Sequence, residues 1–422
     1  MSITLSLTHD CNLRCSYCYA GRKSHRAMTR ETMRRALEWA VGYHKEHRLG
    51  RRFVLGFFGG EPLLEWNLLR EADILAERLC RDAGLELGRT VTTNGTLLDE
   101  AKAGWLMERH YTLGLSLDGP PERHDRFRRH ADGIGSYAEA VRAIRLLSSY
   151  REPCPQFICV VRPDSLESVP EAVRHLASLA AFPIALNPDF TAPWKPSDRE
   201  PFRRAYGEVS DFCVSEWRAG RPLHVTWIDA KVKTLLMDGY REQDRCCPVR
   251  RELAAAPSGN LYPCPNLVGE DDRVDLRLGD VFSGIDAEAL RKALSRCGSS
   301  LPACKSCPVA PRCQNWCGCA NWFSTGRTDG VSPFQCFYEK TTIELADRVA
   351  ETLLAEKCEP FLAYFGDFIQ VAAPEVAAEV SGAARSPSAS PPSTPIPRVA
   401  GGGRRCRRAT CHSLTPRPAV PS

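Results

Sequence analysis

The sequence predicts an α/β protein with a parallel β-sheet, followed by a cysteine-rich segment of different character. Through the first half of the 422 residues, short runs of β-type residues alternate with amphipathic stretches of helical length. Strands that alternate with helices indicate right-handed βαβ units, wrapped as a barrel or as an open sheet. From about Cys246 to about Cys336, Cys, Pro and Gly replace this periodicity. The cysteines are the obvious organiser of that segment, because metal binding can supply folding energy.

The expected elements follow one another in a regular order. Strands are expected at residues 3–7, 52–58, 90–93, 112–118, 156–161 and 183–187. Helices are expected at residues 31–47, 63–81, 137–150, 166–179, 201–218 and 339–354. In such folds ligands bind at the carboxyl ends of the strands, so the residues directly after each strand are candidate site residues.

The net charge of +5 does not indicate a nucleic-acid-binding surface. Residues 383–422 carry seven Arg and no acidic residue, so the rest of the chain has a net charge of −2. The same stretch contains eight Pro, and we expect the tail from about Ser381 to be disordered. No apolar run reaches the roughly 18 residues that span a bilayer, so no membrane association is expected.

Twenty cysteines are the most unusual feature of the composition. A disulfide-rich secreted protein needs an export signal, and the first residues, MSITLSLTHDCNLRC, have neither a basic nor an apolar signal region. We therefore expect a cytoplasmic, reducing location. There, clustered cysteines point to metal binding or catalysis rather than to disulfides.

Cys11, Cys15 and Cys18 follow the first expected strand with the spacing CxxxCxxC. Three thiolates so close in sequence can hold three corners of an iron–sulfur cube and leave its fourth iron open for substrate or cofactor chemistry. The alternatives are coincidental thiols, or a structural zinc with a fourth ligand such as His9 or His25. Tyr17, before the last cysteine, favours the iron–sulfur interpretation.

This loop resembles the signature of the radical S-adenosylmethionine (radical SAM) superfamily, which follows the first strand of a partial (βα)6 barrel. Three later segments fit the same family: GGEP at 59–62, TTNGTLLD at 92–99 and SLDGPPERHDRFR at 116–128. Taken singly, GGEP could be a simple turn, Asp118-Gly119-Pro120 could mark a loop, and Arg128 could be a solvated charge in a basic run. All of them occur in order, each at the carboxyl end of an expected strand, which favours the resemblance.

The resemblance implies that a [4Fe–4S] cluster on these three cysteines binds SAM and cleaves it to a 5′-deoxyadenosyl radical. Two glycines let a backbone approach a ligand closely, and the carboxylate of Glu61 can stabilise the ammonium of SAM. The residues implied at the SAM site are Tyr17, Gly59, Gly60, Glu61, Ser116, Asp118 and Arg128, with Tyr17 bordering the adenine.

The second set of cysteines resembles the SPASM domain of peptide-modifying radical SAM enzymes, which binds two auxiliary [4Fe–4S] clusters. The resemblance covers about residues 246–336. One implied ligand set is Cys304, Cys307, Cys313 and Cys336; the other is Cys246, Cys264 and Cys317. A pair of structural zinc sites is the competing interpretation, because CxxC pairs are common in zinc knuckles.

One departure from the relatives concerns the second of these ligand sets. In the sulfatase-maturating relatives a further upstream cysteine completes the cluster, but residues 240–245 (YREQDR) contain none. The cluster is then expected either to recruit Cys247 or to keep an open iron that binds a substrate thiolate. Most of the remaining cysteines need no function. Cys319, two residues after Cys317, is the unassigned cysteine of most interest.

The function expected from these features is oxidative maturation, such as crosslinking, of a ribosomally made peptide, with the auxiliary clusters as an electron exit. An anaerobic sulfatase-maturating enzyme is the alternative, disfavoured because the relatives' catalytic Asp after the cysteine matching Cys264 is Pro265 here. A zinc-containing binding protein is the non-enzymatic alternative. The expected partners are a peptide or protein substrate and an electron donor such as flavodoxin or ferredoxin.

The expected organisation has five parts. Since the first strand begins almost at Met1, peptide recognition is expected to use the barrel, the SPASM region or a second protein. The parts are a radical SAM core at 1–200, a helical bridge at 201–245, a SPASM domain at 246–340, a C-terminal helix at 341–380 and a disordered tail at 381–422.

Overall fold

The computed structural model describes residues 1–150, 152–246, 252–297 and 301–372. The expected disordered tail and Cys247 therefore lie outside the described residues. Within those residues the strands form one sheet in the order β10-β9-β8-β7-β1-β2-β3-β4-β5-β6. The strands are β1 Ser2–Ser6, β2 Arg52–Phe58, β3 Glu86–Thr93, β4 Tyr111–Ser116, β5 Gln156–Val161, β6 Ile184–Pro188, β7 Glu252–Ala255, β8 Asn260–Tyr262, β9 Gly279–Asp280 and β10 Gly284–Ile285.

All six strands expected in the first half are present, and each pairs in parallel with the next. They are rich in Val, Ile, Leu and Phe, which suits strands whose faces are covered by other layers. Their carboxyl ends meet at one edge of the sheet, where the loops that follow β1, β2, β3 and β4 come together. The sequence therefore located this edge correctly.

The strands of the cysteine-rich half were not expected, and they extend the same sheet. β7 pairs in parallel with β1, from Ser2 opposite Glu252 to Leu5 opposite Ala255. β8, β9 and β10 then continue in antiparallel pairing. These strands are only two to four residues long, and they give no periodicity that a sequence pattern can detect.

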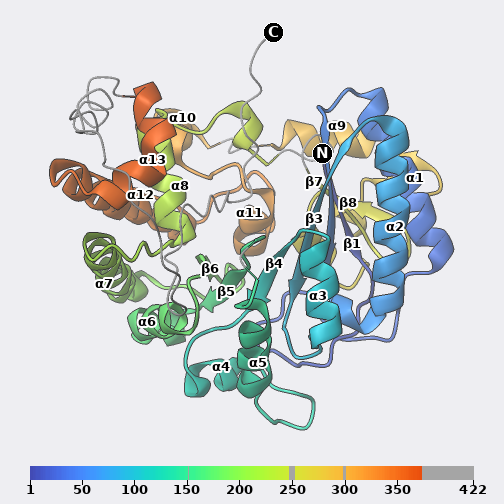
Figure 1. Cartoon of the computed structure of the whole chain (residues 1–422). Helices are drawn as coiled ribbons and strands as arrows, with labels where there is room; N and C mark the ends of the chain where they lie inside the picture. The colour runs from blue at the N-terminus through green and yellow to red at the C-terminus, as the bar shows by residue number, and fades with distance from the viewer. Residues whose placement is uncertain (151, 247–251, 298–300, 373–422) are drawn as a thin grey trace, which may run out of the picture.

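Helices lie around the outside of the curved sheet, with α1, α2 and α3 on one side and α6 and α7 on the other (Figure 1). The stretches expected to be helical correspond to α1, α2, α5, α6, α7 and α12; the remaining helices were not expected. The bounds are α1 Arg30–Glu46, α2 Trp66–Ala83, α3 Glu100–Glu108, α4 Pro121–Phe127, α5 Tyr137–Leu147, α6 Val169–Leu179, α7 Arg199–Arg218, α8 Thr226–Leu236, α9 Ala287–Ser295, α10 Pro302–Lys305, α11 Gly318–Thr325, α12 Pro333–Ala355 and α13 Glu359–Ala372.

Local capping explains where two of these helices begin. The Thr29 side chain accepts a hydrogen bond from the Thr32 N–H at the start of α1. α12 begins six residues before its expected start, because Ser332 caps it and Pro333 occupies its first position. The sequence pattern placed the apolar face of α12 correctly but did not include this first turn.

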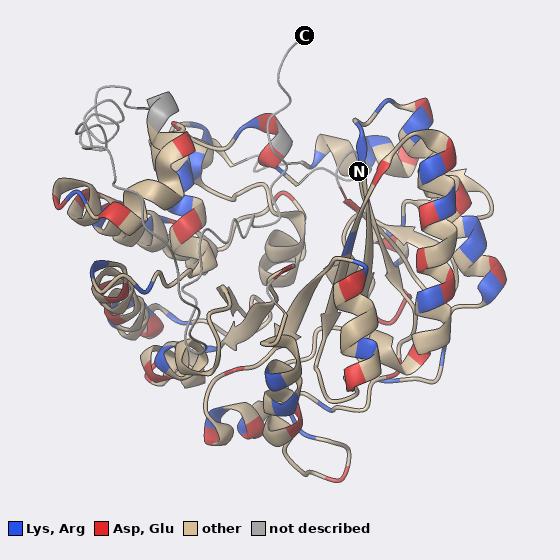
Figure 2. Cartoon of the chain, in the orientation of Figure 1, with Lys and Arg blue, Asp and Glu red and all other residues tan. Residues whose placement is uncertain are grey.

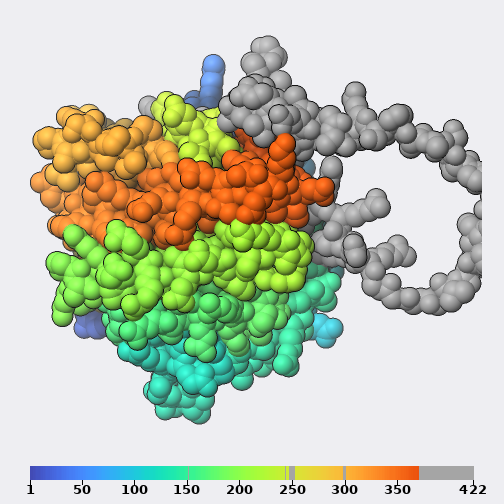
Figure 3. All heavy atoms as spheres, turned by 90° about the vertical axis from the view of Figure 1, so that its left-hand side faces the viewer, coloured from blue at the N-terminus to red at the C-terminus, as the bar shows by residue number. Residues whose placement is uncertain are grey.

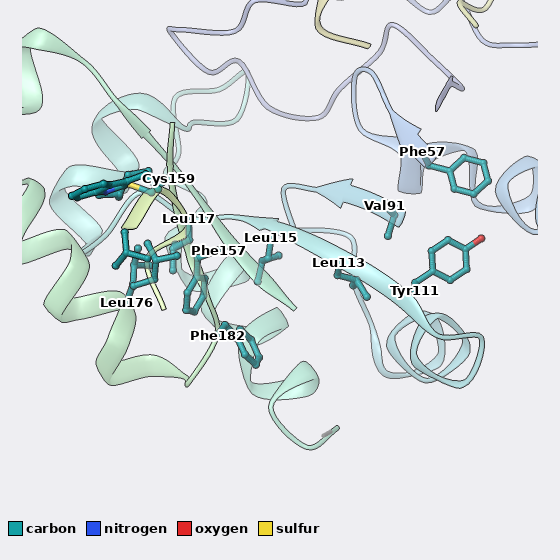
Figure 4. Close-up of a cluster of buried hydrophobic side chains, with 14 of the residues drawn as sticks. Phe57, Val91, Tyr111, Leu113, Leu115, Leu117, Phe157, Cys159, Leu176 and Phe182 are labelled. Carbon is teal, nitrogen blue, oxygen red and sulfur yellow. The ribbon is translucent and has the colours of Figure 1, made fainter. Parts of the chain in front are cut away.

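The core lies between the sheet and the outer helices. Figure 4 shows Leu115 and Phe157, from β4 and β5, gathered with Leu176 of α6. Phe57 and Tyr111 form a second group, with their rings stacked 6.2 Å apart. Each large apolar side chain that is fully buried contributes roughly 1.5–3 kcal/mol. Charged residues are concentrated on the outer helices (Figure 2), and the buried side chains of the sheet are mostly apolar.

The C-terminal helices α7, α8 and α12 pack against one another, and their segments form adjacent bands on one face (Figure 3). A buried ion pair joins two of them: Lys231 Nζ of α8 lies 2.6 Å from Glu339 Oε2 of α12, and each side chain is 3% exposed. Lys231 also donates to the Arg312 carbonyl, and Glu339 accepts from the Gln314 N–H. The pair thereby ties the cysteine-rich segment to the helices. No helix of the described ranges is both long and apolar enough to cross a membrane.

Candidate active site at the strand ends

The loop after β1 carries Cys11, Cys15 and Cys18. The Leu13 N–H and the Asn94 side-chain amide donate to Cys11 Sγ, at 3.4 and 3.7 Å. Lys23 Nζ lies 2.9 Å from Cys18 Sγ. Burial raises the pKa of the Cys11 thiol to about 11, and it raises the pKa of Cys15 as well. The neighbouring thiols add to this effect: Cys15 raises the pKa of Cys11, and Cys18 raises the pKa of Cys15.

This donor set fits an iron–sulfur cluster. Thiolates are the ligands of iron–sulfur iron, and hydrogen bonds to the sulfur atoms tune such clusters. A bound cation would offset the cost of burying several thiolates together. Three cysteines supply three ligands, and the sequence interpretation of an open fourth iron is compatible with that count.

The loop after β2 is locked against the cysteine loop by its two glycines. The Gly60 N–H donates to the Thr8 carbonyl over 3.0 Å, and the Glu61 N–H donates to the Asp10 carbonyl over 2.8 Å. Gly59 has a φ of +116°, a conformation that favours glycine. A Cβ on Gly60 would lie 1.8 Å from the Asp10 carbonyl oxygen. The close approach that these glycines allow in the structure is therefore to the cysteine loop itself; contact with SAM remains a prediction.

Glu61 is 1% exposed, and its carboxylate joins the loops after β2 and β3. It accepts hydrogen bonds from the Thr93 hydroxyl at 2.7 Å and from the Leu63 and Asn94 N–H groups at 3.1 and 2.8 Å. Burial raises the pKa of Glu61 to about 7 against the effect of these donors. Much of the carboxylate's hydrogen-bonding capacity thus serves the protein itself, and its expected contact with the SAM ammonium stays a prediction.

Tyr17, Asp118 and Arg128 form one buried network. Asp118 accepts hydrogen bonds from Arg128 Nε at 3.0 Å, from the Val160 N–H at 2.9 Å and from the Tyr17 hydroxyl. The Arg128 guanidinium also lies 5.2 Å from the centre of the Tyr17 ring. Burial alone would raise the pKa of Asp118, but the positive charge of Arg128, together with smaller contributions that include the hydrogen bonds from Tyr17 and Val160, outweighs burial and holds the pKa below its usual value. These three predicted site residues therefore act as one unit.

The network reaches the cysteine loop. The charges of Arg128 and Asp118 both act on the Cys15 thiol, and the Ser16 N–H donates to the Phe127 carbonyl over 3.0 Å. Ser116, the last residue of β4, is buried beside Ile158 of β5. The structure thus places the residues predicted after β1, β2 and β4 at the same edge of the sheet.

The predicted auxiliary set of Cys246, Cys264 and Cys317 has a further cysteine, Cys319, in contact with it. Cys317 Sγ and Cys319 Sγ lie 3.5 Å apart, and Cys319 is also hydrogen-bonded to Cys264. Cys246 lies close enough to Cys264 to act on its charge. In the sequence, the contact between Cys317 and Cys319 is indicated by their CxC spacing.

Tyr19 lies near both cysteine regions, and it was not predicted as a site residue from the sequence. Its hydroxyl lies within electrostatic range of Cys18 and also of Cys264 and Cys319, and burial raises its pKa well above the usual value. Its ring stacks on Phe58 and meets Phe323 edge-on, with both ring centres 6.0 Å away. The aromatic residue directly after Cys18 was the available signal.

The other predicted auxiliary set consists of Cys304, Cys307, Cys313 and Cys336. Cys313 and Cys336 lie within electrostatic range of each other, and burial raises the pKa of Cys313 to about 12. The Cys307 N–H donates to the Cys304 carbonyl over 3.4 Å. In the part of the chain that the structure describes, no three His, Cys, Asp or Glu side chains converge on a single-ion site.

Comparison with known proteins identifies the N-terminal part of the chain. Residues 5–176 match the Radical SAM superfamily. The chain contains a radical SAM domain. The match begins in β1 and ends in α6, so it includes the cysteine loop and all the other strand-end residues described above. SAM with a [4Fe–4S] cluster is the cofactor that this domain implies, and the three clustered thiols fit it.

Two curated relatives extend the similarity beyond the radical SAM domain. A cysteine-type anaerobic sulfatase-maturating enzyme of Clostridium perfringens is 24% identical over 328 residues, which cover 73% of this chain and 85% of the relative. A serine-type anaerobic sulfatase-maturating enzyme of Klebsiella aerogenes is 25% identical over 320 residues, covering 73% and 76%.

A solved structure described as native anSMEcpe with bound AdoMet and Cp18Cys peptide superposes with a TM-score of 0.70 at 21% identity. The match covers 83% of this chain and 98% of that one. The fold class expected from the sequence, a radical SAM α/β core with a parallel sheet and a cysteine-rich SPASM-type C-terminal segment, is confirmed.

Proposed function

We propose that this radical SAM enzyme is a maturase that oxidises a side chain within a peptide or protein substrate; the relatives that it matches are named as anaerobic sulfatase-maturating enzymes. The observation that carries the proposal is the proximity of cysteines from both regions, Cys18 and the pair of Cys264 and Cys319, to Tyr19, in a chain that matches those relatives over 73% of its length. When bound, SAM on a [4Fe–4S] cluster supplies a 5′-deoxyadenosyl radical.

The chain's own residues hold and shield that chemistry. Cys11, Cys15 and Cys18 supply the thiolate ligands of the cluster. Asp118 fixes Arg128 and Tyr17 beside it, and we assign Tyr17 to the edge of the adenine. Glu61 keeps the loops after β2 and β3 closed around the site, which helps to exclude water from a reactive centre.

The auxiliary cysteines support an oxidative outcome. Two auxiliary [4Fe–4S] clusters, one on each C-terminal cysteine set, would take up the electron that remains after a substrate C–H bond has been broken. The set that contains Cys264 lies within electrostatic range of Tyr19, as Cys18 does. We expect a flavodoxin or ferredoxin to be the electron donor and the location to be a reducing cytoplasm.

Crosslinking of a ribosomally made peptide is the second candidate, and one residue favours it. Pro265, at the start of the 3-10 turn Pro265–Leu267, directly follows Cys264, and its side chain can accept no proton. If sulfatase maturation needs an acidic base at this position, the base must come from elsewhere in this chain. The named relatives nevertheless give sulfatase-type maturation more support than crosslinking.

The experiment is anaerobic turnover of cluster-loaded protein with SAM, a reductant and three peptides that differ only in Cys, Ser or Ala at one position. The readouts are 5′-deoxyadenosine and peptide mass, with Cys15→Ala as the control. An aldehyde formed from Cys or Ser identifies sulfatase-type maturation, whereas loss of two hydrogens without an aldehyde identifies crosslinking. If the wild type forms no more 5′-deoxyadenosine than Cys15→Ala does, the proposal is wrong.

A further inference from the structure

We propose that Cys319 is the fourth protein ligand of the auxiliary cluster on Cys246, Cys264 and Cys317. This inference rests on the proposed function, because it assumes that the C-terminal cysteines bind iron and sulfide. It replaces both sequence-based expectations for this cluster, which were recruitment of Cys247 or an open iron.

The first argument is the position of the Cys319 sulfur. It lies 3.5 Å from Cys317 Sγ and is hydrogen-bonded to Cys264. Cys319 is therefore in direct contact with two of the three assigned ligands. The side chains are in van der Waals contact without a cluster, and they must spread around the larger iron–sulfur cube when it binds.

The second argument is a cavity that the same thiols face. Its volume is about 280 Å³, and the sulfur-bearing residues Cys246, Cys264 and Cys319 all line it, together with Trp316. Cys317 lies directly beside it through its contact with Cys319. The space into which the thiols could spread therefore adjoins the proposed ligands.

The third argument is a hydrogen bond to the Cys319 sulfur. The Asn266 side-chain amide donates to Cys319 Sγ over 3.7 Å. N–H groups that donate to ligand sulfur atoms are a feature of iron–sulfur sites, where they tune the cluster. Cys317 occupies the N-cap position of α11 and Cys319 lies in its first turn, so both cysteines belong to the start of one helix.

Cys297 provides a matched comparison. It lines the same cavity, but it is exposed at the end of α9, next to residues outside the described ranges. Its sulfur donates to the Ala293 carbonyl over 3.6 Å. Both cysteines line the cavity, and Cys319 is also in contact with the assigned ligands. Comparing variants of the two therefore separates an effect of cluster ligation from an effect of proximity to the cavity.

With four cysteine ligands the cluster has no open iron. A substrate thiolate could then not bind to it without displacing a protein ligand. The proposal therefore assigns this cluster to electron transfer rather than to substrate binding.

The test uses a background with Cys11, Cys15 and Cys18 all changed to Ala, which removes the cluster of the radical SAM domain. Anaerobically reconstituted protein is analysed for iron, sulfide and zinc and by Mössbauer and EPR spectroscopy. Adding Cys319→Ala should lower iron and sulfide by roughly four each per chain, or convert the cluster to one with a distinct iron site. Adding Cys297→Ala should change neither quantity.

Three outcomes are informative. Unchanged iron, sulfide and spectra with Cys319→Ala, alongside a loss with Cys247→Ala, overturn the inference and leave the proposed function intact. A background that holds zinc or no metal overturns the auxiliary clusters of the proposed function as well. A loss confined to Cys319→Ala supports the inference.

A measurement on the wild-type chain avoids the risk that a variant misfolds. Cluster-loaded protein is alkylated with iodoacetamide before and after the iron is removed with a chelator, and the labelled cysteines are identified by mass spectrometry. Cys319 should be protected only while iron is bound, whereas Cys297 should be labelled in both states. Equal labelling of Cys319 in both states would contradict the proposal.

Discussion

Asp118 and Arg128 form a buried ion pair at the edge of the sheet, with Asp118 Oδ2 3.0 Å from Arg128 Nε and side chains 0% and 8% exposed. Both residues come from the loop region after β4, and the Tyr17 hydroxyl of the cysteine loop donates to the same Asp118 oxygen. The pair therefore connects two loops that the chain separates by about a hundred residues.

Changing Asp118 to Asn should destabilise the protein by about 3 kcal/mol, because the Arg128 charge is left buried without a counter-charge. Urea unfolding of the cluster-free protein measures this change. Asp164→Asn is the matched control: its carboxylate lies 2.9 Å from Arg126 but is 46% exposed. That variant should lose no more than about 1 kcal/mol. Equal losses of unfolding free energy in the two variants would show that burial does not make the Asp118 pair more stabilising than the exposed pair.

Glu61 should make stability fall as pH rises from about 4.5 to about 7. Its pKa in the folded state is raised to about 7 from an ordinary value of 4.5 by burial. The folded protein therefore holds a proton that the unfolded chain has lost, and the free energy of unfolding decreases through this interval.

The Glu61→Gln variant should lose this component, which amounts to about 3 kcal/mol across the interval. Unfolding of cluster-free wild type and variant is compared at pH 4.5 and pH 8. Burial raises the pKa of Glu252 too, but Glu252 is present in both proteins and its effect cancels in the difference. Parallel stability curves for wild type and variant would refute the prediction.

Lys231→Met should destabilise the protein by about 3 kcal/mol or more, because Glu339 is left as a buried, unpaired carboxylate. Adding Glu339→Gln should recover part of this loss, since the amide is neutral and its oxygen can still accept the Gln314 N–H. The control is Arg348→Met, which removes an exposed pair with Asp211 that spans 3.0 Å. Chemical denaturation should show a loss below about 1 kcal/mol there.

Gly60→Ala should disrupt the site, because the added Cβ would lie 1.8 Å from the Asp10 carbonyl oxygen. The cysteine loop and the loop after β2 must then separate, and we expect less iron at the N-terminal cluster together with lower stability. Gly42→Ala is the matched control: no atom lies within 4 Å of the added Cβ, and Gly42 is inside α1. It should be neutral or stabilise by up to about 1 kcal/mol. The iron content and the thermal unfolding of both variants test this prediction. It is wrong if Gly60→Ala binds as much iron and is as stable as Gly42→Ala.

The sequence was most informative where periodicity or spacing is strong. The first six strands and the helices between β1 and β2, and between β5 and β6, follow from apolar patterns. The shared position of Tyr17, Asp118 and Arg128 follows from the rule that parallel strands end at one edge.

The rest depends on contacts between distant segments. β7 is a four-residue strand whose register is fixed by pairing with β1, including a 3.0 Å hydrogen bond from Thr4 to Glu252. The meeting of Cys319 with Cys264 likewise depends on how α11 packs. Cys319 was noted from its spacing, but its partner could not be derived from a single sequence.

The pairing of β1 with β7 has a consequence for electron movement. β1 is hydrogen-bonded to β2 on one edge and to β7 on the other, so the loop with Cys11, Cys15 and Cys18 and the turn with Cys264 emerge from one continuous sheet. A ladder of backbone hydrogen bonds, rather than a flexible linker, sets the gap between the two cysteine regions. An electron that passes between them would cross a distance that is the same in every turnover.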